Sequence, residues 1–287
     1  MLRIYYSYRE SNLSRKVCKS WDENLSLANF RRYWYLLVSY VQFACSTISS
    51  SLSSQDIFDH LYSFVPLEDA ARAACASRGF LRSWRRYPRL VFDYKTLGLD
   101  RFCQTEREGT LASTDERDDG EHRIESHLVN KIDRVLKNRS DIGVMKAFTL
   151  HLHACPNMEA SYVDYWLQFA LKPGVEKLAL EMSLLEKRAE YNFPCSLLSN
   201  ETGGSPQSLR LSSCAFHPRT ALGCHKSLTS LDLSFVHITG KELGHLVSNC
   251  HALAKLFLYG CNGIIYFRVP GVLWHLNHFH VIECKKL

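Results

Sequence analysis

The sequence lacks the short motifs that mark the commonest enzyme active sites. It contains no G-x-x-x-x-G-K-[ST] phosphate loop, no G-x-S-x-G nucleophile turn and no H-E-x-x-H metal-binding helix. No grouping of serine, histidine and acid can be assembled from the order of residues along the chain. We therefore expect a non-catalytic protein that uses no cofactor.

Paired cysteines are also lacking. The 11 cysteines are an odd number, scattered along the chain, and no two of them form a C-x-x-C pair. This pattern excludes a disulfide framework and the usual structural zinc sites. Free thiols are typical of a reducing compartment, so we expect a cytoplasmic or nuclear protein.

A long apolar run is missing as well. The run Tyr33–Cys45 follows Arg31 and Arg32, but Ser39 and Gln42 interrupt it. It is shorter than the roughly 20 residues that span a bilayer, and it starts too late for an ordinary signal peptide. We expect no membrane segment here. Residues 1–50 are an N-terminal extension, and the sequence leaves open whether it is folded.

The remaining composition is that of a globular protein. Hydrophobic residues make up 46% of 287 residues, which allows one large domain or two smaller ones. The net charge of +6 allows acidic partners without singling out nucleic acid. Arginines cluster around Trp84, but arginines on a short solvated helix are ordinary. We expect no nucleic-acid binding.

Three short helices are predicted between Asp56 and Phe92. Ile57, Leu61 and Phe64 share one helical face, and Pro66 ends that helix. An alanine-rich run, 68–75, and a run around Trp84 follow, and a second proline stops the latter. So few short helices bury a core poorly. Either the unit keeps an apolar face for a partner, or it is a hairpin inside a larger core.

The same stretch resembles an F-box, most closely that of cereal-plant F-box/leucine-rich-repeat proteins of the FBD-like family. The resemblance rests on Asp56-Ile57, Ser63–Leu67, Asp69–Cys75, Ser77-Arg78 and Phe80–Trp84. It implies an F-box at residues 51–92 that docks on a Skp-type adaptor and, through it, on a cullin. The adaptor-binding residues implied are Ile57, Leu61, Phe64, Pro66, Leu67, Ala71, Ala74, Cys75 and Trp84.

One departure from the family lies just before this stretch. The family usually opens with Leu-Pro, whereas this chain has Ser53-Ser54. The change removes an apolar anchor and a helix-starting proline. Whether this F-box still binds the adaptor stays open.

Residues 93–123 are predicted to be a linker, partly disordered. Between Thr105 and His122 the only large apolar residue is Leu111, so this part cannot bury enough surface to offset its chain entropy. A helix over Ile124–Lys137 follows, with an apolar stripe. We expect this helix to cap the end of the structure that comes after it.

Residues 124–287 then carry a leucine-rich repeat, L-x-x-L-x-L. The starts, at residues 145, 175, 206, 228, 253 and 276, are separated by 30, 31, 22, 25 and 23 residues. A further short match is Ile264/Phe267/Val269. Cysteine falls three residues after the last apolar position in three units, at Cys214, Cys261 and Cys284. The cereal family resemblance extends here and covers about residues 52–287. The expected fold is an α/β solenoid: a short all-helical F-box and an irregular repeat arc, whose completeness stays open.

The residues between the strand leucines are predicted to face outward, onto the concave side. Among them we expect the target-binding residues to be Arg210, Asp232, Lys255, Phe257, Tyr259, Tyr266, Arg268, His278 and His280. Exposed aromatics favour a partner, although a further repeat or a loop could equally cover them. The set His275, His278, His280 and Cys284 contains metal-ligand types, but alternation along the strand sends the thiol and the imidazoles to opposite faces. We expect no metal there.

The function that the resemblance implies is substrate recognition in a Skp-cullin-F-box (SCF) ubiquitin ligase. The F-box would hold the adaptor, and the repeat arc would hold an unknown target protein. The alternative is a repeat scaffold outside any ligase, with a degenerate F-box. A histidine-based enzyme at the C-terminal end is a third and weaker hypothesis.

Overall fold

The computed structural model describes residues 62, 67, 70, 71, 74, 78–99, 114–139, 145–184, 190–198, 206–218, 227–268 and 273–285. The chain forms two compact units, Met1–Tyr87 and Pro88–Leu287. The predictions for the run Tyr33–Cys45 and for Ile57, Leu61, Phe64, Pro66 and Cys75 lie outside the described residues. In the described part of the chain, no helix is both long enough and apolar enough to cross a membrane.

The described residues of the first unit are helical up to Arg86. Tyr62, Leu67, Ala70, Ala71 and Ala74 are helical and buried. The last helix, α5 (Arg78–Arg86), buries Trp84 and exposes Arg82 and Arg86. These observations agree with an α-helical N-terminal unit and do not by themselves identify an F-box.

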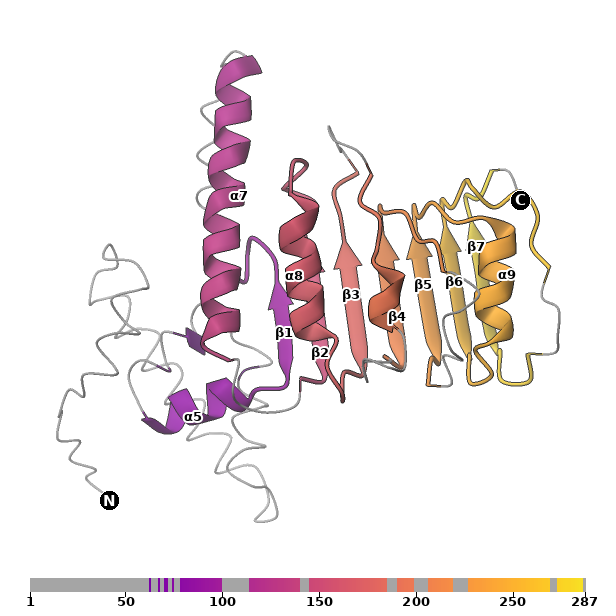
Figure 1. Cartoon of the computed structure of the whole chain (residues 1–287), viewed down its shortest axis with the longest axis horizontal. Helices are drawn as coiled ribbons and strands as arrows, with labels where there is room; N and C mark the ends of the chain where they lie inside the picture. The colour runs from indigo at the N-terminus through magenta and orange to yellow at the C-terminus, as the bar shows by residue number, and fades with distance from the viewer. Residues whose placement is uncertain are drawn as a thin grey trace, which may run out of the picture. The chain divides into compact units, whose positions relative to one another are not determined.

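The second unit is built on a parallel sheet of seven strands in the order β1 to β7. The strands are β1 (Arg89–Phe92), β2 (Ala147–His151), β3 (Lys177–Glu181), β4 (Ser208–Ser212), β5 (Ser230–Ser234), β6 (Lys255–Tyr259) and β7 (His278–Ile282). Neighbours in sequence are neighbours in the sheet (Figure 1). Each strand with its return connection is therefore one repeat of a solenoid-like arc.

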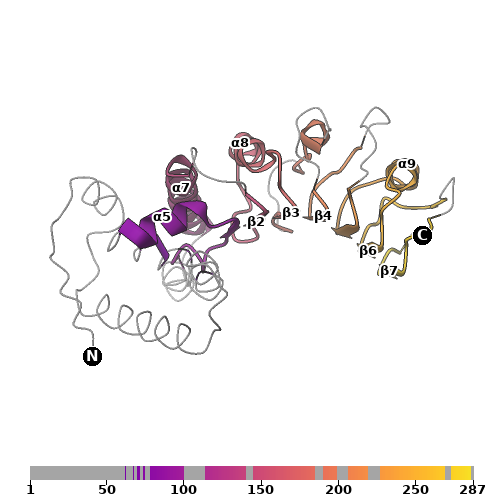
Figure 2. The ribbon, with the colours of Figure 1, turned by 90° about the horizontal axis from the view of Figure 1, so that it is seen from below.

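The connections between the strands carry the helices. They are α7 (Thr114–Lys137), α8 (Ala160–Ala170), the 3-10 helix η1 (Cys195–Leu198) and α9 (Gly240–Ser248). Figure 2 shows α7, α8 and α9 on the same side of the sheet. No helix described in this second unit lies on the opposite side of the sheet, which we call the open face.

Two apolar rows run across the sheet and form the core beneath the helices. In each strand the second and fourth residues stack on their equivalents next door, as in Leu209↔Leu231 and Leu211↔Leu233. From β1 to β6 all of these side chains are at most 2% exposed. In β7 the equivalents Phe279 and Val281 are 48% and 37% exposed, because no described strand follows. The predicted repeat phase is confirmed by burial in β2 to β6 and by register with β6 in β7.

The residue after each of the last four strands has left-handed backbone. Ser213, Phe235, Gly260 and Glu283 have φ of 56°, 54°, 62° and 56°. This turn ends the strand and directs the next side chain inward. Cys214 and Cys261 occupy that position fully buried, as the in-phase cysteines predicted, while Cys284 is half-buried at the open end.

The sheet begins earlier than the sequence analysis placed it. Arg89–Phe92, assigned to the F-box, pairs with β2 from Arg89↔Ala147 to Phe92↔Leu150. Leu90 and Phe92 are fully buried, so this segment alternates like the other strands. The segment 89–92 therefore belongs to the repeat unit, and the predicted boundary at residue 92 is wrong.

The linker predicted for 93–123 is largely structured where it is described. Residues 93–99 form turns that bury Leu97 and Leu99. Helix α7 starts at Thr114, ten residues before the predicted start at Ile124. Its second half packs through Leu128, Ile132 and Val135, and extending a nucleated helix costs little. The polar composition of residues 105–122 predicted disorder, because composition does not show that the apolar second half of α7 can nucleate a helix that extends into them.

Helix α7 does not cap the end of the arc as predicted. It is the crossover from β1 to β2 and lies in the helical layer with α8. Trp166 of α8 donates from Nε1 to Asp133 Oδ1 at 2.9 Å, and the Asn157 N–H donates to Glu125 Oε1 at 2.9 Å. These bonds fix α7 as part of the first repeat.

The extra repeat match at Ile264/Phe267/Val269 is not a strand within the residues described. Residues 266–268 have no regular structure and pass over α9. A Cβ on Gly240 would collide with the Tyr266 carbonyl oxygen, and one on Gly244 would lie 2.6 Å from that of Arg268. Tyr266 and Arg268 are exposed, but they lie beside the helical layer and not on the open face.

This close approach gives a stability prediction for Gly240→Ala. In a free helix, alanine is about 1 kcal/mol better than glycine. Here the collision with backbone should reverse the sign, because overpacking costs about 1–3 kcal/mol or more. We expect a lower free energy of unfolding in chemical denaturation. The neighbouring exposed variant Lys241→Ala should be within about 0.5 kcal/mol of wild type. A stabilised Gly240→Ala protein would contradict the packing of 266–268 on α9.

The start of α9 gives a second prediction. Thr239 and Glu242 form a capping box, and Glu242 Oε1 also lies 2.9 Å from His217 Nδ1. Burial raises the pKa of the Glu242 carboxyl, but the hydrogen bonds from Thr239 and His217 outweigh it, so its net pKa is lowered.

A lowered pKa in the folded state stabilises the fold above the unfolded value of about 4.3, and this stabilisation disappears as pH falls through the folded value. The difference in unfolding free energy between wild type and Glu242→Gln should therefore be largest near neutral pH and shrink below about pH 4. Denaturant titrations at several pH values measure it. A difference that does not change with pH would be inconsistent with an ionised cap.

Candidate functional site on the open face of the sheet

The open face is lined by the first, third and fifth residues of each strand. Along β2 to β6 these positions are half-buried or exposed, while the second and fourth are buried. The outward phase predicted from the sequence is therefore confirmed for β3 to β6. Equivalent residues of successive strands form rows across the sheet, and neighbours within a row sit on strands about 4.8 Å apart.

The middle of the face is small and polar, with one ion pair. Ser208, Ser212, Ser230 and Ser234 flank Arg210 and Asp232, which face each other across β4 and β5. Arg210 Nε donates to Asp232 Oδ2 at 2.8 Å. The Arg210 side chain is 57% exposed, so this pair contributes little to stability. Its charges remain accessible to a partner.

Aromatic side chains gather toward the C-terminal end. Phe257 lies beside His280 with ring centroids 6.2 Å apart, and Phe235 meets Tyr259 edge-on at 4.9 Å. Hydrogen bonding to Glu283 raises the pKa of the Tyr259 phenol. Phe235 is 37% exposed and packs over Gly260, where an added Cβ would lie 2.6 Å from the ring. Phe257, Tyr259 and Phe235 form the aromatic patch.

The structure brings most of the predicted target-binding residues together. Arg210, Asp232, Phe257 and His280 lie in one row, and Lys255 pairs with His278 in another. Tyr259 completes the set on β6. Tyr266 and Arg268 are separated from them, as described above. Sequence reasoning missed Phe235. This residue follows β5 with a left-handed backbone, and alternation within a strand does not predict where such a side chain lies.

The adaptor-binding residues that the structure describes are all buried. Leu67, Ala71, Ala74 and Trp84 are at most 7% exposed. Side chains with so little exposed area stabilise the chain itself and offer almost no surface to an adaptor. This burial is that of the chain without an adaptor, so adaptor binding through these residues stays a prediction.

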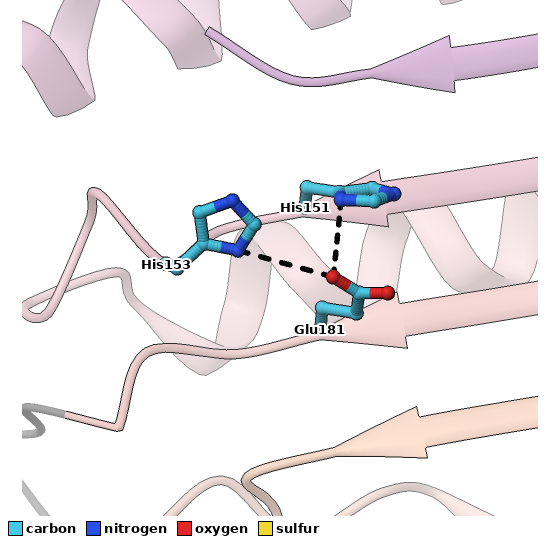
Figure 3. Close-up of side chains that lie close together, drawn as sticks. All are labelled: His151, His153 and Glu181. Carbon is cyan, nitrogen blue, oxygen red and sulfur yellow. Dashed lines mark ion pairs between the residues drawn. The ribbon is translucent and has the colours of Figure 1, made fainter. Parts of the chain in front are cut away.

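A cluster of two histidines and a glutamate occupies the other end of the face. His151 Nδ1 lies 3.1 Å from Glu181 Oε2, and His153 Nδ1 lies 3.9 Å from the same oxygen. In Figure 3 dashed lines join one nitrogen of each imidazole to the same oxygen of the carboxylate. Among the described residues this is the one group of three side chains whose ligand atoms are close enough to share a metal ion. His275, His278, His280 and Cys284, which the sequence analysis rejected as a ligand set, are not such a group in the described region.

The sequence contained a signal for this cluster. His151 and His153 are two residues apart, which places them on one side of an extended chain, and aligning the repeats sets His151 beside Glu181. Sequence reasoning missed the pair, because its candidate residues begin at Arg210 on β4.

Comparison with known proteins identifies the repeat unit. The leucine-rich-repeat domain family of At1g61320/AtMIF1 matches residues 135–287. The chain belongs to this family. No curated protein and no solved structure matches it. The family match covers β2 to β7 of the leucine-rich-repeat unit and lies outside the helical N-terminal unit, so the F-box resemblance stays a prediction.

The alternation between core and open face predicts losses of very different size for adjacent substitutions in β5 of the leucine-rich-repeat unit. Leu231→Ala removes a fully buried side chain and should lower the unfolding free energy by about 2–5 kcal/mol. Asp232→Ala removes the ion pair with the exposed Arg210 and a long hydrogen bond from Ser234, and should cost less than about 1 kcal/mol. Chemical denaturation of both variants measures this. Equal losses would contradict the assigned faces.

Proposed function

We propose that this leucine-rich-repeat protein is the substrate-recognition subunit of an SCF-type ubiquitin ligase. The helical N-terminal unit docks on a Skp-type adaptor, and the open face binds a target protein. The observation that carries the target-binding part of the proposal is the open face itself, where one sheet presents charges and aromatic rings outward between β2 and β7.

The open face suits protein recognition for a physical reason. Its side chains project from hydrogen-bonded strands, so little backbone entropy is lost when a partner binds. The aromatic patch supplies the ring types that are enriched among binding hot spots, and Arg210 beside Asp232 supplies paired charges of opposite sign. The serines between them leave room for a partner's side chains.

The ligase role rests on the F-box resemblance of the N-terminal unit. In this arrangement ubiquitin transfer belongs to other subunits. The chain contributes two binding sites in one polypeptide, which raises the effective concentration of the target near the ligase.

A scaffold outside any ligase is the second candidate. Two observations favour it: Ser53-Ser54 replaces the family's Leu-Pro, and Leu67, Ala71, Ala74 and Trp84 are buried. On this hypothesis the open face still binds a protein, but no adaptor associates with the N-terminal unit.

Adaptor binding separates the two candidates. The full chain and a purified plant Skp-type adaptor are mixed and measured by calorimetry or pull-down. We expect wild type to bind and Leu61→Asp to bind at least about tenfold more weakly, because burying an unpaired charge is costly. Lys255→Asp, which also introduces a negative charge but on the open face, should bind the adaptor like wild type.

Circular dichroism controls for folding of each variant. If folded wild-type chain does not bind the adaptor, the ligase proposal fails and the scaffold stands. If Leu61→Asp binds as tightly as wild type, the adaptor is not held by the predicted helical face.

A further inference from the structure

The strand register places three metal-ligand side chains at one end of the open face. His151 and Glu181 are the last residues of β2 and β3 and pair directly across the sheet. His153 follows two residues later, after the buried Leu152. Their side chains are partly accessible, at 26%, 25% and 48% for His151, Glu181 and His153. An ion could therefore reach the ligand atoms without any part of the fold opening.

The distances between the donor atoms fit a small tetrahedral ion. Zinc binds imidazole nitrogen and carboxylate oxygen at about 2.0–2.2 Å, so two ligands of a tetrahedron lie about 3.4 Å apart. Glu181 Oε2 lies 3.1 Å from His151 Nδ1 and 3.9 Å from His153 Nδ1. The observed separations lie on either side of the tetrahedral value. The ring centroids of His151 and His153 are 5.6 Å apart, so the two imidazoles would have to draw closer to the same ion on binding.

Two other histidine–glutamate pairs on this unit provide an internal comparison. His217 meets Glu242 at 2.9 Å and His237 meets Glu190 at 3.4 Å, although the two rings are only 5.7 Å apart. There each imidazole has its own carboxylate. At the first site two imidazoles share one carboxylate, and the ligand atoms of all three side chains lie within 4.8 Å of one another.

We propose that His151, His153 and Glu181 bind a zinc ion. Two histidines and one carboxylate form a ligand set that zinc uses when its fourth position stays open. That position faces solvent on the open face, where water or a side chain of a bound partner can complete the tetrahedron. Zinc fits better than magnesium or calcium, because those ions prefer sites made of oxygen ligands. The inference does not depend on the ligase proposal.

Metal titration of the full chain tests the site. The purified chain is freed of metal with a chelator, kept reduced, and titrated with zinc against a chromophoric competitor. We expect wild type to hold one zinc equivalent at this site with micromolar affinity or better. His153→Gln and Glu181→Gln should each lose that equivalent or bind it at least about tenfold more weakly. His237→Gln, which alters an exposed histidine paired with a glutamate, should keep it.

Cobalt replaces zinc as a spectroscopic probe, because other histidines and free thiols in the chain can also bind metal. Occupation of the site should give the visible absorption of tetrahedral Co²⁺ without a thiolate charge-transfer band, and Glu181→Gln should remove it. Circular dichroism checks that the variants remain folded. Equal zinc binding by wild type, His153→Gln and Glu181→Gln would overturn the proposal, as would a wild-type chain that binds no zinc at micromolar concentrations. The cluster would then be a histidine–carboxylate ion pair only.

Discussion

The register of the parallel sheet is the constraint on which the rest of the structure depends. Residues at equivalent positions of successive strands lie directly beside one another, so the leucines form two continuous buried rows. Period-two alternation then requires the residues between them to form continuous rows on the opposite face. A slip of one residue in any strand would exchange the two sets. The core and the open face are thus fixed by the same hydrogen-bond ladder.

The two ends of the open face carry different side chains. Outward positions do not have to be apolar, because they do not pack in the core. Histidine and glutamate meet on β2 and β3, serine with an arginine–aspartate pair occupies β4 and β5, and aromatic rings gather on β6. The buried rows tolerate no such variation from β1 to β6, where every side chain is nearly inaccessible. The chemical character of the surface can change along the arc while its backbone repeats. The polar end suits an ion or a charged partner, and the aromatic end suits an apolar anchor.

Much of this fold could be predicted from the sequence, because the leucine-rich-repeat template recurs along residues 145–287. Leu209/Leu211 and Leu231/Leu233 needed only the repeat template to be placed in the core. Leu90 and Phe92 have the same alternation, but their position beside the F-box-like stretch hid it. Ile264/Phe267 had the pattern and yet forms no strand, because its backbone packs on Gly240 and Gly244. A template cannot represent that contact between distant segments.

The candidate sites were less predictable for a related reason. Arg210 and Phe257 were correctly placed facing outward because strand period decides direction. His151 and His153 share the Glu181 oxygen because of the register between β2 and β3. The two strands are separated by α8 and its loops, so this register can be predicted only after the two repeats have been aligned across that connection. The burial of Trp84 depends on packing around the short N-terminal helices, and helical periodicity alone gives no measure of it.

Hydrogen–deuterium exchange of the native full chain tests the central claim of one continuous in-register sheet from Arg89 to Ile282. Peptides that cover Arg89–Phe92 should exchange slowly, together with those of β2 to β6, because β1 is hydrogen-bonded to β2. Peptides that cover Tyr266–Arg268 should exchange faster, since they join no strand. Fast exchange at Arg89–Phe92, or strand-like protection at Tyr266–Arg268, would contradict this register and with it the assignment of the open face.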